Sequence, residues 1–277
     1  ADTLLPRCQA TDRRYRVLEA QAHLARQESD TSAYLKALYT LGDYFAALPP
    51  GPERDALKGG ALWNRFYLLE LRFDLGDLTD GGQAMERFLA SLDPEVDEPL
   101  LLWTVHMNLG SIQRDLGFHK AARAHLDAAR TFATGDGFTA ERALIEVGEV
   151  RLLIKEGSIS DARQRLTQLQ ASPEGAALLR DAPRRALMID RLWGDLLLAE
   201  GKPRGADAHF QAILNHDASE AENRWRARLG LARVKQLQGD LAGELAISKE
   251  AIDELEAQRL AGGADRWPLA HITQRES

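Results

Sequence analysis

The sequence predicts an all-α fold, a right-handed solenoid built from antiparallel helix pairs. Three observations lead to this prediction. Leu, Ala, Arg, Glu and Gln, which favour helices, are abundant, whereas the β-branched residues are sparse. No stretch between turn signals alternates apolar and polar residues over the length of a strand. Turn signals centred on glycine recur about every 40 residues, as in helical repeat arrays.

The N-terminal segment, residues 1–53, is predicted to form a helical pair that caps the array. Residues 13–28 and 33–48 each carry an apolar stripe with helical spacing, and Asp30 lies at the break between them. The prolines from Pro49 to Pro52 end the second helix, because proline does not fit a helix interior.

Residues 54–260 are predicted to hold five helix pairs. In each pair the first helix ends at a glycine, since glycine adopts the left-handed C′ conformation at little cost. A second helix then begins two to four residues later, near Thr79, Ser160 or Pro203 in three of the pairs. Ser219 and Glu222 have the spacing of a capping box. The five glycines are Gly76, Gly117, Gly157, Gly201 and Gly239.

Small or apolar residues recur at fixed distances from these glycines, where two helices are expected to cross. Seven residues before the glycines stand Leu69, Gly110, Val150, Gly194 and Ala232. Five residues after them stand Gly81, Ala122, Ala162, Ala206 and Glu244. Twelve residues after them stand Phe88, Ala129, Leu169, Ile213 and Ala251. We expect these side chains to be buried between helices.

The pattern resembles the tetratricopeptide (TPR) repeat. One unit carries it as Leu109, Gly110, Gly117, Ala122, Leu126 and Ala129. Another carries it as Trp193, Gly194, Gly201, Ala206, Phe210 and Ile213. The spacing near 40 residues is similar to the long-helix TPR type of bacterial regulators and of caspase-like CHAT proteases. The resemblance implies a concave groove, lined by the first helices, that binds a protein or peptide.

In the register of a TPR array, positions six and two residues before each glycine face this groove. With their neighbours, the candidate groove residues are Met107, Asn108, Ser111, Arg114, Arg151, Lys155, Arg191, Asp195, Arg226 and Arg233. A cluster of like charge is unfavourable without a partner, and arginine binds carboxylate or phosphate bidentately. We therefore expect an acidic or carboxylate-bearing ligand, with Met107, Leu144 and Met188 as apolar anchors.

Two further interpretations of these residues stay open. The set loosely resembles the carboxylate clamp of chaperone-binding TPR domains, with Asn108, Arg151 and Lys155 in comparable roles. The first unit departs from the clamp, since it has Phe66 and Glu70 in place of Lys and Asn. In the other interpretation the basic residues pair within the groove, with Asp115, Glu146, Asp190 and Asp195.

Other kinds of site find no support in the sequence. It contains no phosphate-binding glycine loop and no nucleophile elbow, and the histidine spacings do not suit a metal, so we expect no catalytic residue, metal or cofactor. The net charge of −7 argues against nucleic acid, and no apolar run is long enough for membrane insertion. Cys8 is the single cysteine, which fits a reducing, cytoplasmic location.

These observations favour a non-catalytic protein- or peptide-binding scaffold. We expect it to be the regulatory or sensing module of a larger bacterial signalling protein, with residues 261–277 as a C-terminal tail or linker. Its partner is then another protein or another domain of the same parent. One alternative is a peptide-responsive switch, similar to TPR receptors of quorum-sensing peptides. Another is the regulatory TPR part of a CHAT protease system.

Overall fold

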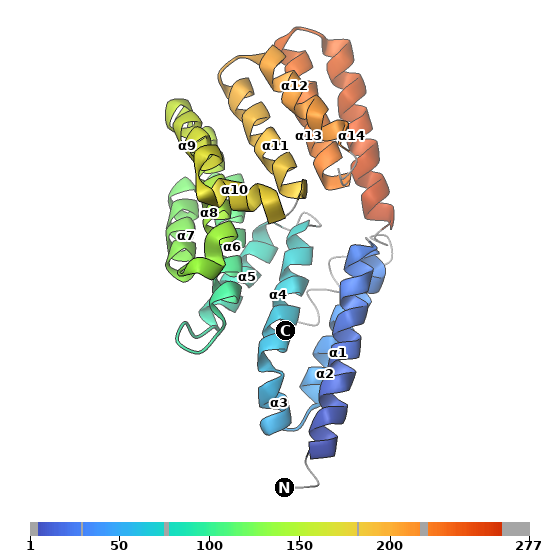
Figure 1. The fold of residues 1–277 in the computed structure, drawn as a ribbon. Coiled ribbons are helices and arrows are strands. Elements are labelled where there is room, and N and C mark those ends of the chain that lie inside the picture. Colours follow the sequence, from blue (N-terminus) through green and yellow to red (C-terminus); the bar gives the residue numbers. More distant parts are fainter. Residues whose placement is uncertain (1–4, 29, 75–77, 182, 217–220, 262–277) are drawn as a thin grey trace. The chain divides into compact units, whose positions relative to one another are not determined.

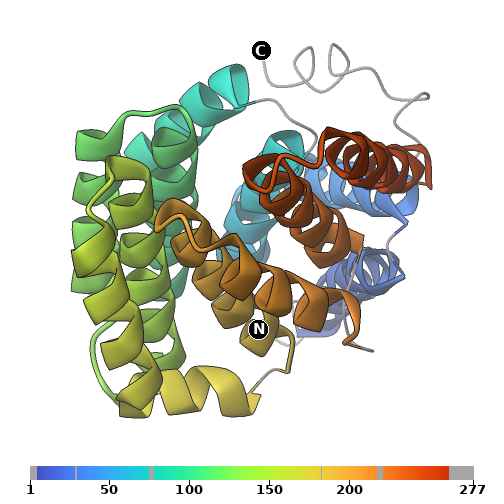
Figure 2. The ribbon, with the colours of Figure 1, turned by 90° about the horizontal axis from the view of Figure 1, so that it is seen from above.

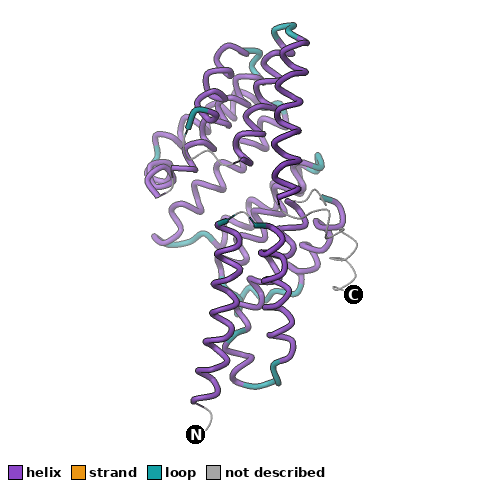
Figure 3. Tube along the Cα trace, turned by 90° about the vertical axis from the view of Figure 1, so that its right-hand side faces the viewer, coloured by secondary structure: helices purple, strands orange, loops and turns teal. Residues whose placement is uncertain are grey.

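A computed structural model describes residues 5–28, 30–74, 78–181, 183–216 and 221–261 (Figure 1). Within these residues the regular structure is helical, which confirms the all-α prediction, and Figure 3 shows helices joined by loops. Among the described helices, none is long and apolar enough to cross a membrane. The α-helices are α1 (Leu5–Gln27), α2 (Thr31–Ala47), α3 (Pro52–Ala56), α4 (Lys58–Asp74), α5 (Thr79–Ala90), α6 (Pro99–Asp115), α7 (His119–Phe132), α8 (Thr139–Glu156), α9 (Ile159–Ala171), α10 (Pro173–Asp181), α11 (Pro183–Ala199), α12 (Pro203–Leu214), α13 (Ala221–Leu237) and α14 (Leu241–Ala261).

The chain divides into two compact units, residues 1–101 with 259–277 and residues 102–258. The sequence instead groups residues 54–101 with the later repeats, and that grouping into five repeats stays a prediction. In the first unit α1 packs on α2, α2 on α4, and α4 on α5. Asp30 caps α2 by accepting a hydrogen bond from the Ala33 backbone N–H at 2.9 Å, so the predicted helical pair is present.

The second unit is a series of helices in which each packs on its neighbours along the chain. Helix α8 packs on α7, α9 and α11, and α11 packs on α12 and α13. The buried side chains fall into successive clusters rather than one central core, first between α7 and α8, then among α8–α11, then among α11–α13. Figure 2 shows these helices following one another in chain order. Such nearest-neighbour packing is what a repeat array requires.

The glycines end helices as predicted. Gly117, Gly157, Gly201 and Gly239 have φ of 83°, 80°, 70° and 78°. After each of them the next backbone N–H donates to a carbonyl five residues back, for example from Phe118 to Gln113 at 2.8 Å. This is the Schellman arrangement, which satisfies carbonyls that the helix leaves without a partner. Gly76 and Ser219 lie outside the described residues.

The predicted crossing positions are buried, except that Glu244 is half-buried. One crossing shows why small residues are needed. The Phe210 ring is fully buried between Gly194 of α11 and Gly230 of α13, and a Cβ on Gly194 would lie 2.6 Å from Phe210 Cζ. Glycine at both positions therefore lets α12 insert its aromatic side chain between two first helices.

Helix α10 is an element that the sequence analysis missed. The predicted break at residues 171–173 is correct, but a new helix follows it and runs across the neighbouring helices (Figures 1 and 2). The Ser172 hydroxyl accepts from the Gly175 N–H at 3.0 Å, and Pro173 occupies the first turn. The added helix accounts for the longer glycine interval in this part of the chain.

A similar ion pair recurs between successive helix pairs of the second unit. Arg123 lies six residues after Gly117 and bonds Glu156, directly before the next glycine, at 2.6 Å. Arg163 likewise lies six residues after Gly157. It bonds Glu200, directly before Gly201, through two nitrogens at 2.5 and 2.6 Å. The repeat register thus extends to polar contacts that the apolar pattern did not reveal.

Candidate functional site: a cationic cluster on four helices

The predicted groove residues all lie in the second unit, on α6, α8, α11 and α13. Arg114, Arg191 and Arg226, one from each of the other three helices, lie near enough to Arg151 for their charges to act on it. The charges of Lys155 and Arg233 act on Asp195, beside the same group. We call this set the cationic cluster. It comprises Arg114, Arg151, Lys155, Arg191, Arg226 and Arg233.

Arg151 lies at the centre of the cationic cluster. The residue is half-buried, and its Nη2 atom is inaccessible to solvent and has no hydrogen-bond partner. Its pKa is held well below the usual value, first by burial and then by the neighbouring charges of Arg191, Arg114 and Arg226. Asp195 acts in the opposite direction. The fold therefore holds a cation where both desolvation and repulsion disfavour the charge.

Asp195 is the carboxylate that faces this cation. It stands one turn after Arg191 on α11. Burial raises the pKa of Asp195, whereas the charges of Arg191, Arg151, Lys155 and Arg233 lower it. One partly desolvated carboxylate is thus shared among several cations, and it cannot form a bidentate pair with each of them.

Of the four acidic residues that the sequence suggested as partners of the basic groove residues, only two lie with them in the structure. Asp115 accepts two hydrogen bonds from Arg114, each at 2.9 Å, and Asp195 lies with the cationic cluster. Glu146 instead binds Arg165 at 2.9 Å, so its expected pairing inside the groove is wrong. The expectation is also wrong for Asp190, which binds His209 at 2.9 Å.

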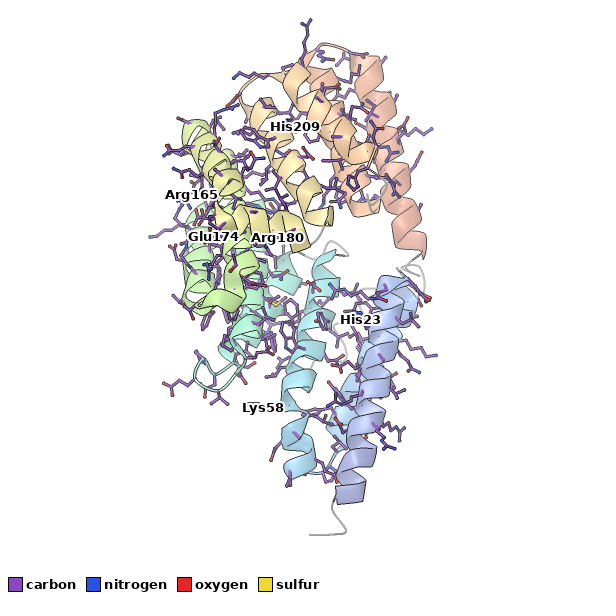
Figure 4. All side chains as sticks on the ribbon, in the orientation of Figure 1. His23, Lys58, Arg165, Glu174, Arg180 and His209 are labelled. Carbon is purple, nitrogen blue, oxygen red and sulfur yellow. The ribbon has the colours of Figure 1, made fainter. Side chains whose placement is uncertain are left out.

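The reason is a polar contact that recurs in three successive helix pairs, those with Gly117, Gly157 and Gly201. The residue eleven before the glycine contacts the residue eight after it, which joins the first helix to the second. The contacts are His106–His125 at 3.0 Å, Glu146–Arg165 at 2.9 Å and Asp190–His209 at 2.9 Å. Figure 4 marks Arg165 on α9 and His209 on α12, the second-helix members of two of these contacts. Glu146 and Asp190 are therefore engaged away from the cationic cluster.

The candidate groove residues on α6 differ in what they contact. Met107, Ser111 and Arg114 line one small pocket of about 10 Å³ against α7 and α8, with room for about one water molecule. The Asn108 amide donates to the Thr104 carbonyl of its own helix at 3.1 Å, so that amide group is already engaged. This contact weakens the comparison with a carboxylate clamp.

The expected apolar anchors are also partly engaged. Leu144 and Met188 are half-buried and pack against the apolar cluster of α8–α11. Met107 is half-buried against the cluster of α7 and α8. Their first role is therefore to complete the helix packing, and they expose only part of their surface.

A larger pocket lies elsewhere, among α7, α8, α9 and α10. It measures about 260 Å³ and is lined by Arg130, Arg142, Ile145, Glu146, Arg165, Gln168, Leu169, Ser172 and Glu174. Figure 4 labels Arg165 and Glu174 on this part of the unit. Arg130 and Arg165 both bind Glu146, and Arg142 donates to the Gly135 carbonyl at 2.7 Å. The arginines of this pocket are therefore engaged within the protein.

Among the residues that the structure describes, no group of three or more His, Cys, Asp or Glu side chains could hold a metal ion. Cys8 lies in α1, in a stretch where the side chains are not described.

Comparison with known proteins adds little. No protein-family model and no curated protein matches the chain. A solved structure similar to it is the crystal structure of BtubC (BKLC) from P. vanneervenii, with 14% sequence identity and a TM-score of 0.46. The match covers 91% of this chain and 92% of that chain. At this identity and TM-score, the likeness supports no conclusion about family or function.

Proposed function

We propose that this chain is a non-catalytic, TPR-like binding scaffold that captures an acidic segment of a protein partner on its cationic cluster. The glycine-ended helices and the nearest-neighbour packing of the second unit support the repeat interpretation. In such an array the first helices of successive units present their side chains along one face. Arg114, Arg151, Arg191 and Arg226 come from four such helices.

The observation that carries this proposal is the state of Arg151. Its Nη2 atom is buried without a partner, and three further arginines act on its charge. A buried cation normally requires a hydrogen-bonded counter-ion, because desolvation otherwise disfavours its charged form. An acidic group bound at the cationic cluster would supply negative charge to several guanidinium groups at once. The free protein thus carries a destabilising feature that a ligand would relieve.

The surroundings of Arg151 suggest how capture proceeds. Lys155 and Arg233 are exposed, so they are placed to attract an acidic segment from solution. The half-buried arginines then bind the acidic groups with less screening than an exposed pair would suffer. We expect association to slow as salt is added, since steering between exposed charges is screened.

A peptide array tests this proposal. Short peptides graded in Asp and Glu content are probed with the wild-type chain and with an Arg151→Gln, Arg191→Gln variant. Arg204→Gln is the matched control, because Arg204 is an exposed arginine of α12, outside the cationic cluster. We expect binding to rise with acidic content, to be lost in the double variant and to be kept in the control. Equal binding by all three proteins would contradict the proposal.

A further inference from the structure

Helix α1 carries an apolar stripe on a side other than the one that packs on α2. Tyr15, Ala22 and Ala25 are buried and join the apolar cluster with α2 (Figure 1). Val17 and Leu24 lie on roughly the opposite side of the helix and are 57% and 54% exposed. Two turns separate them, so they share one face. A terminal pair of a repeat array usually presents a polar outer face, and this apolar stripe departs from that rule.

Further exposed residues continue this face at helical spacings of three and four residues. We call the whole set the α1 stripe. It comprises Arg13, Val17, Ala20, Gln21, Leu24 and Glu28, all of them exposed. Glu28 follows the last residue of α1, but its backbone N–H still donates to the Leu24 carbonyl at 2.9 Å, which keeps it in the helical register. Within the described part of the chain, no hydrogen bond or ion pair engages the side chain of Arg13 or Glu28.

The apolar part of the α1 stripe is complementary to itself. Consider two copies of the helix that pack antiparallel about a point between Ala20 and Gln21. Val17 of each copy then faces Leu24 of the other, so the same apolar contact forms twice. Ala20 lies at the centre, where its short side chain lets the two helices approach closely. One patch thus serves both partners, as a two-fold dimer requires.

The charges at the two ends of the α1 stripe favour the same arrangement. In the antiparallel pair Arg13 of each copy faces Glu28 of the other, so an ion pair forms at each end of the apolar contact. In a parallel pair each of these charges would instead face its own copy, which is repulsive. Charge therefore selects both a second copy of this chain as the occupant and the antiparallel direction of packing.

We propose that this chain self-associates into a two-fold dimer through antiparallel packing of the α1 stripes. The stripe extends over about 22 Å of helix, at 1.5 Å per residue. A contact of this size lies at the small end of protein interfaces, so the dimer forms reversibly and its population depends on protein concentration. The α1 stripe lies in the first unit and the cationic cluster in the second, so this inference and the proposed function can fail independently.

Charge reversal at the two ends tests the proposal. Arg13→Glu and Glu28→Arg each place like charges together at both ends of the dimer, so each should weaken self-association about tenfold. An equimolar mixture of the two variants restores opposite charges at both ends, and it should therefore form a heterodimer about as tight as the wild-type dimer. Arg204→Glu makes the same change of charge on α12, outside the α1 stripe, and should dimerise as the wild type does.

Sedimentation equilibrium of the full chain over a concentration series, at low ionic strength, measures these constants. A reductant prevents Cys8 of α1 from forming a disulfide between two chains. Leu24→Ser removes two apolar contacts from the dimer and should also weaken it about tenfold. Because Leu24 is exposed, the fold should persist in this variant, and circular dichroism checks that it does.

Two results would overturn the proposal. The first is a wild-type chain that stays monomeric even at millimolar concentration. The second is a dimer that neither charge reversal weakens, or a mixture of the two variants that associates no better than its components. The association would then use another surface, such as the side of α14 that exposes Leu241, Leu245 and Ile252.

Discussion

Replacing Arg151 with methionine should stabilise the ligand-free protein. Methionine keeps an unbranched side chain and removes a guanidinium group that three other arginines repel and whose Nη2 lacks a partner. Exchanging buried charges for apolar groups is often neutral or stabilising by about 1–4 kcal/mol. Because Arg151 is only half-buried and Asp195 partly compensates its charge, we expect the lower end, about 1–2 kcal/mol.

Removing Arg151 also removes a positive charge that stabilises the ionised Asp195 carboxylate, but the other cations around Asp195 limit this loss of stability. Arg191, Lys155 and Arg233 still act on its carboxylate after Arg151 is removed. The substitution therefore does not leave Asp195 without compensating charge. At about 2–4 °C per kcal/mol for a unit of this size, the expected increase in unfolding temperature is roughly 2–8 °C.

Urea unfolding followed by tryptophan fluorescence measures the effect, with Trp193 and Trp225 as reporters in the second unit. Arg204→Met is the control, and we expect its free energy of unfolding to stay within about 0.5 kcal/mol of the wild-type value. A loss of about 3 kcal/mol or more in Arg151→Met would refute the reasoning. A loss of that size is typical of breaking a buried ion pair, so Arg151 would then be satisfied within the protein.

Three further predictions concern the packing and the recurrent polar contacts. Gly194→Ala should destabilise the second unit by about 1–2 kcal/mol, because its new Cβ would press on Phe210; the loss is read from urea unfolding and should shrink when Phe210 is also shortened to leucine. The hydrogen bond from Arg163 lowers the pKa of Glu200 to about 2. The ionised carboxylate therefore stabilises the fold above pH 4.5, and this contribution is lost as the pH falls toward 2. Unfolding curves of Glu200→Gln should lack that part of the pH dependence. Burial and the neighbouring His125 lower the pKa of His106 to about 4. Between pH 6.5 and 4 the unfolded chain therefore binds more protons than the folded chain, so the free energy of unfolding decreases as the pH is lowered through that range. His106→Leu should flatten this slope, and an unchanged slope would assign it to another group.

The repeat register could be predicted because it depends on backbone conformation. Only glycine takes the left-handed C′ position cheaply, so Gly117, Gly157, Gly201 and Gly239 mark helix ends directly in the sequence. The crossing positions follow from the same register, since helix geometry fixes which residues share a face. Gly194 illustrates this, because its place in the repeat anticipated its close contact with a neighbouring helix.

The elements that were missed had weaker signals. Helix α10 has only nine residues and lies between two strong repeat units, although Ser172 and Pro173 are a recognisable helix start. The contacts between residues eleven before and eight after Gly117, Gly157 and Gly201 were also overlooked. Their chemistry changes from His–His to Glu–Arg to Asp–His, so a comparison of residue types does not reveal them.

The sequence predicted which residues belong to the candidate site, but it did not predict how they pair. Counting back from the glycines placed Arg151 at a groove position, and Arg114, Arg191 and Arg226 were included as its possible neighbours on other first helices. In the structure the charges of these three arginines act on Arg151. The sequence could not show which acidic residues pair with them, because that depends on side-chain geometry across helices. Glu146 is the clear example, since it is taken by Arg165.

The most direct test of the central claim locates the bound acidic group by NMR. An acetylated tetraglutamate peptide is titrated into the labelled chain, and the arginine Nε–Hε resonances are followed, with assignments made from single substitutions. We predict that the shifts concentrate on Arg114, Arg151, Arg191 and Arg226 and vanish in Arg151→Gln. Shifts centred instead on Arg165 and its neighbours would contradict the account and assign acidic recognition to the pocket beside α10.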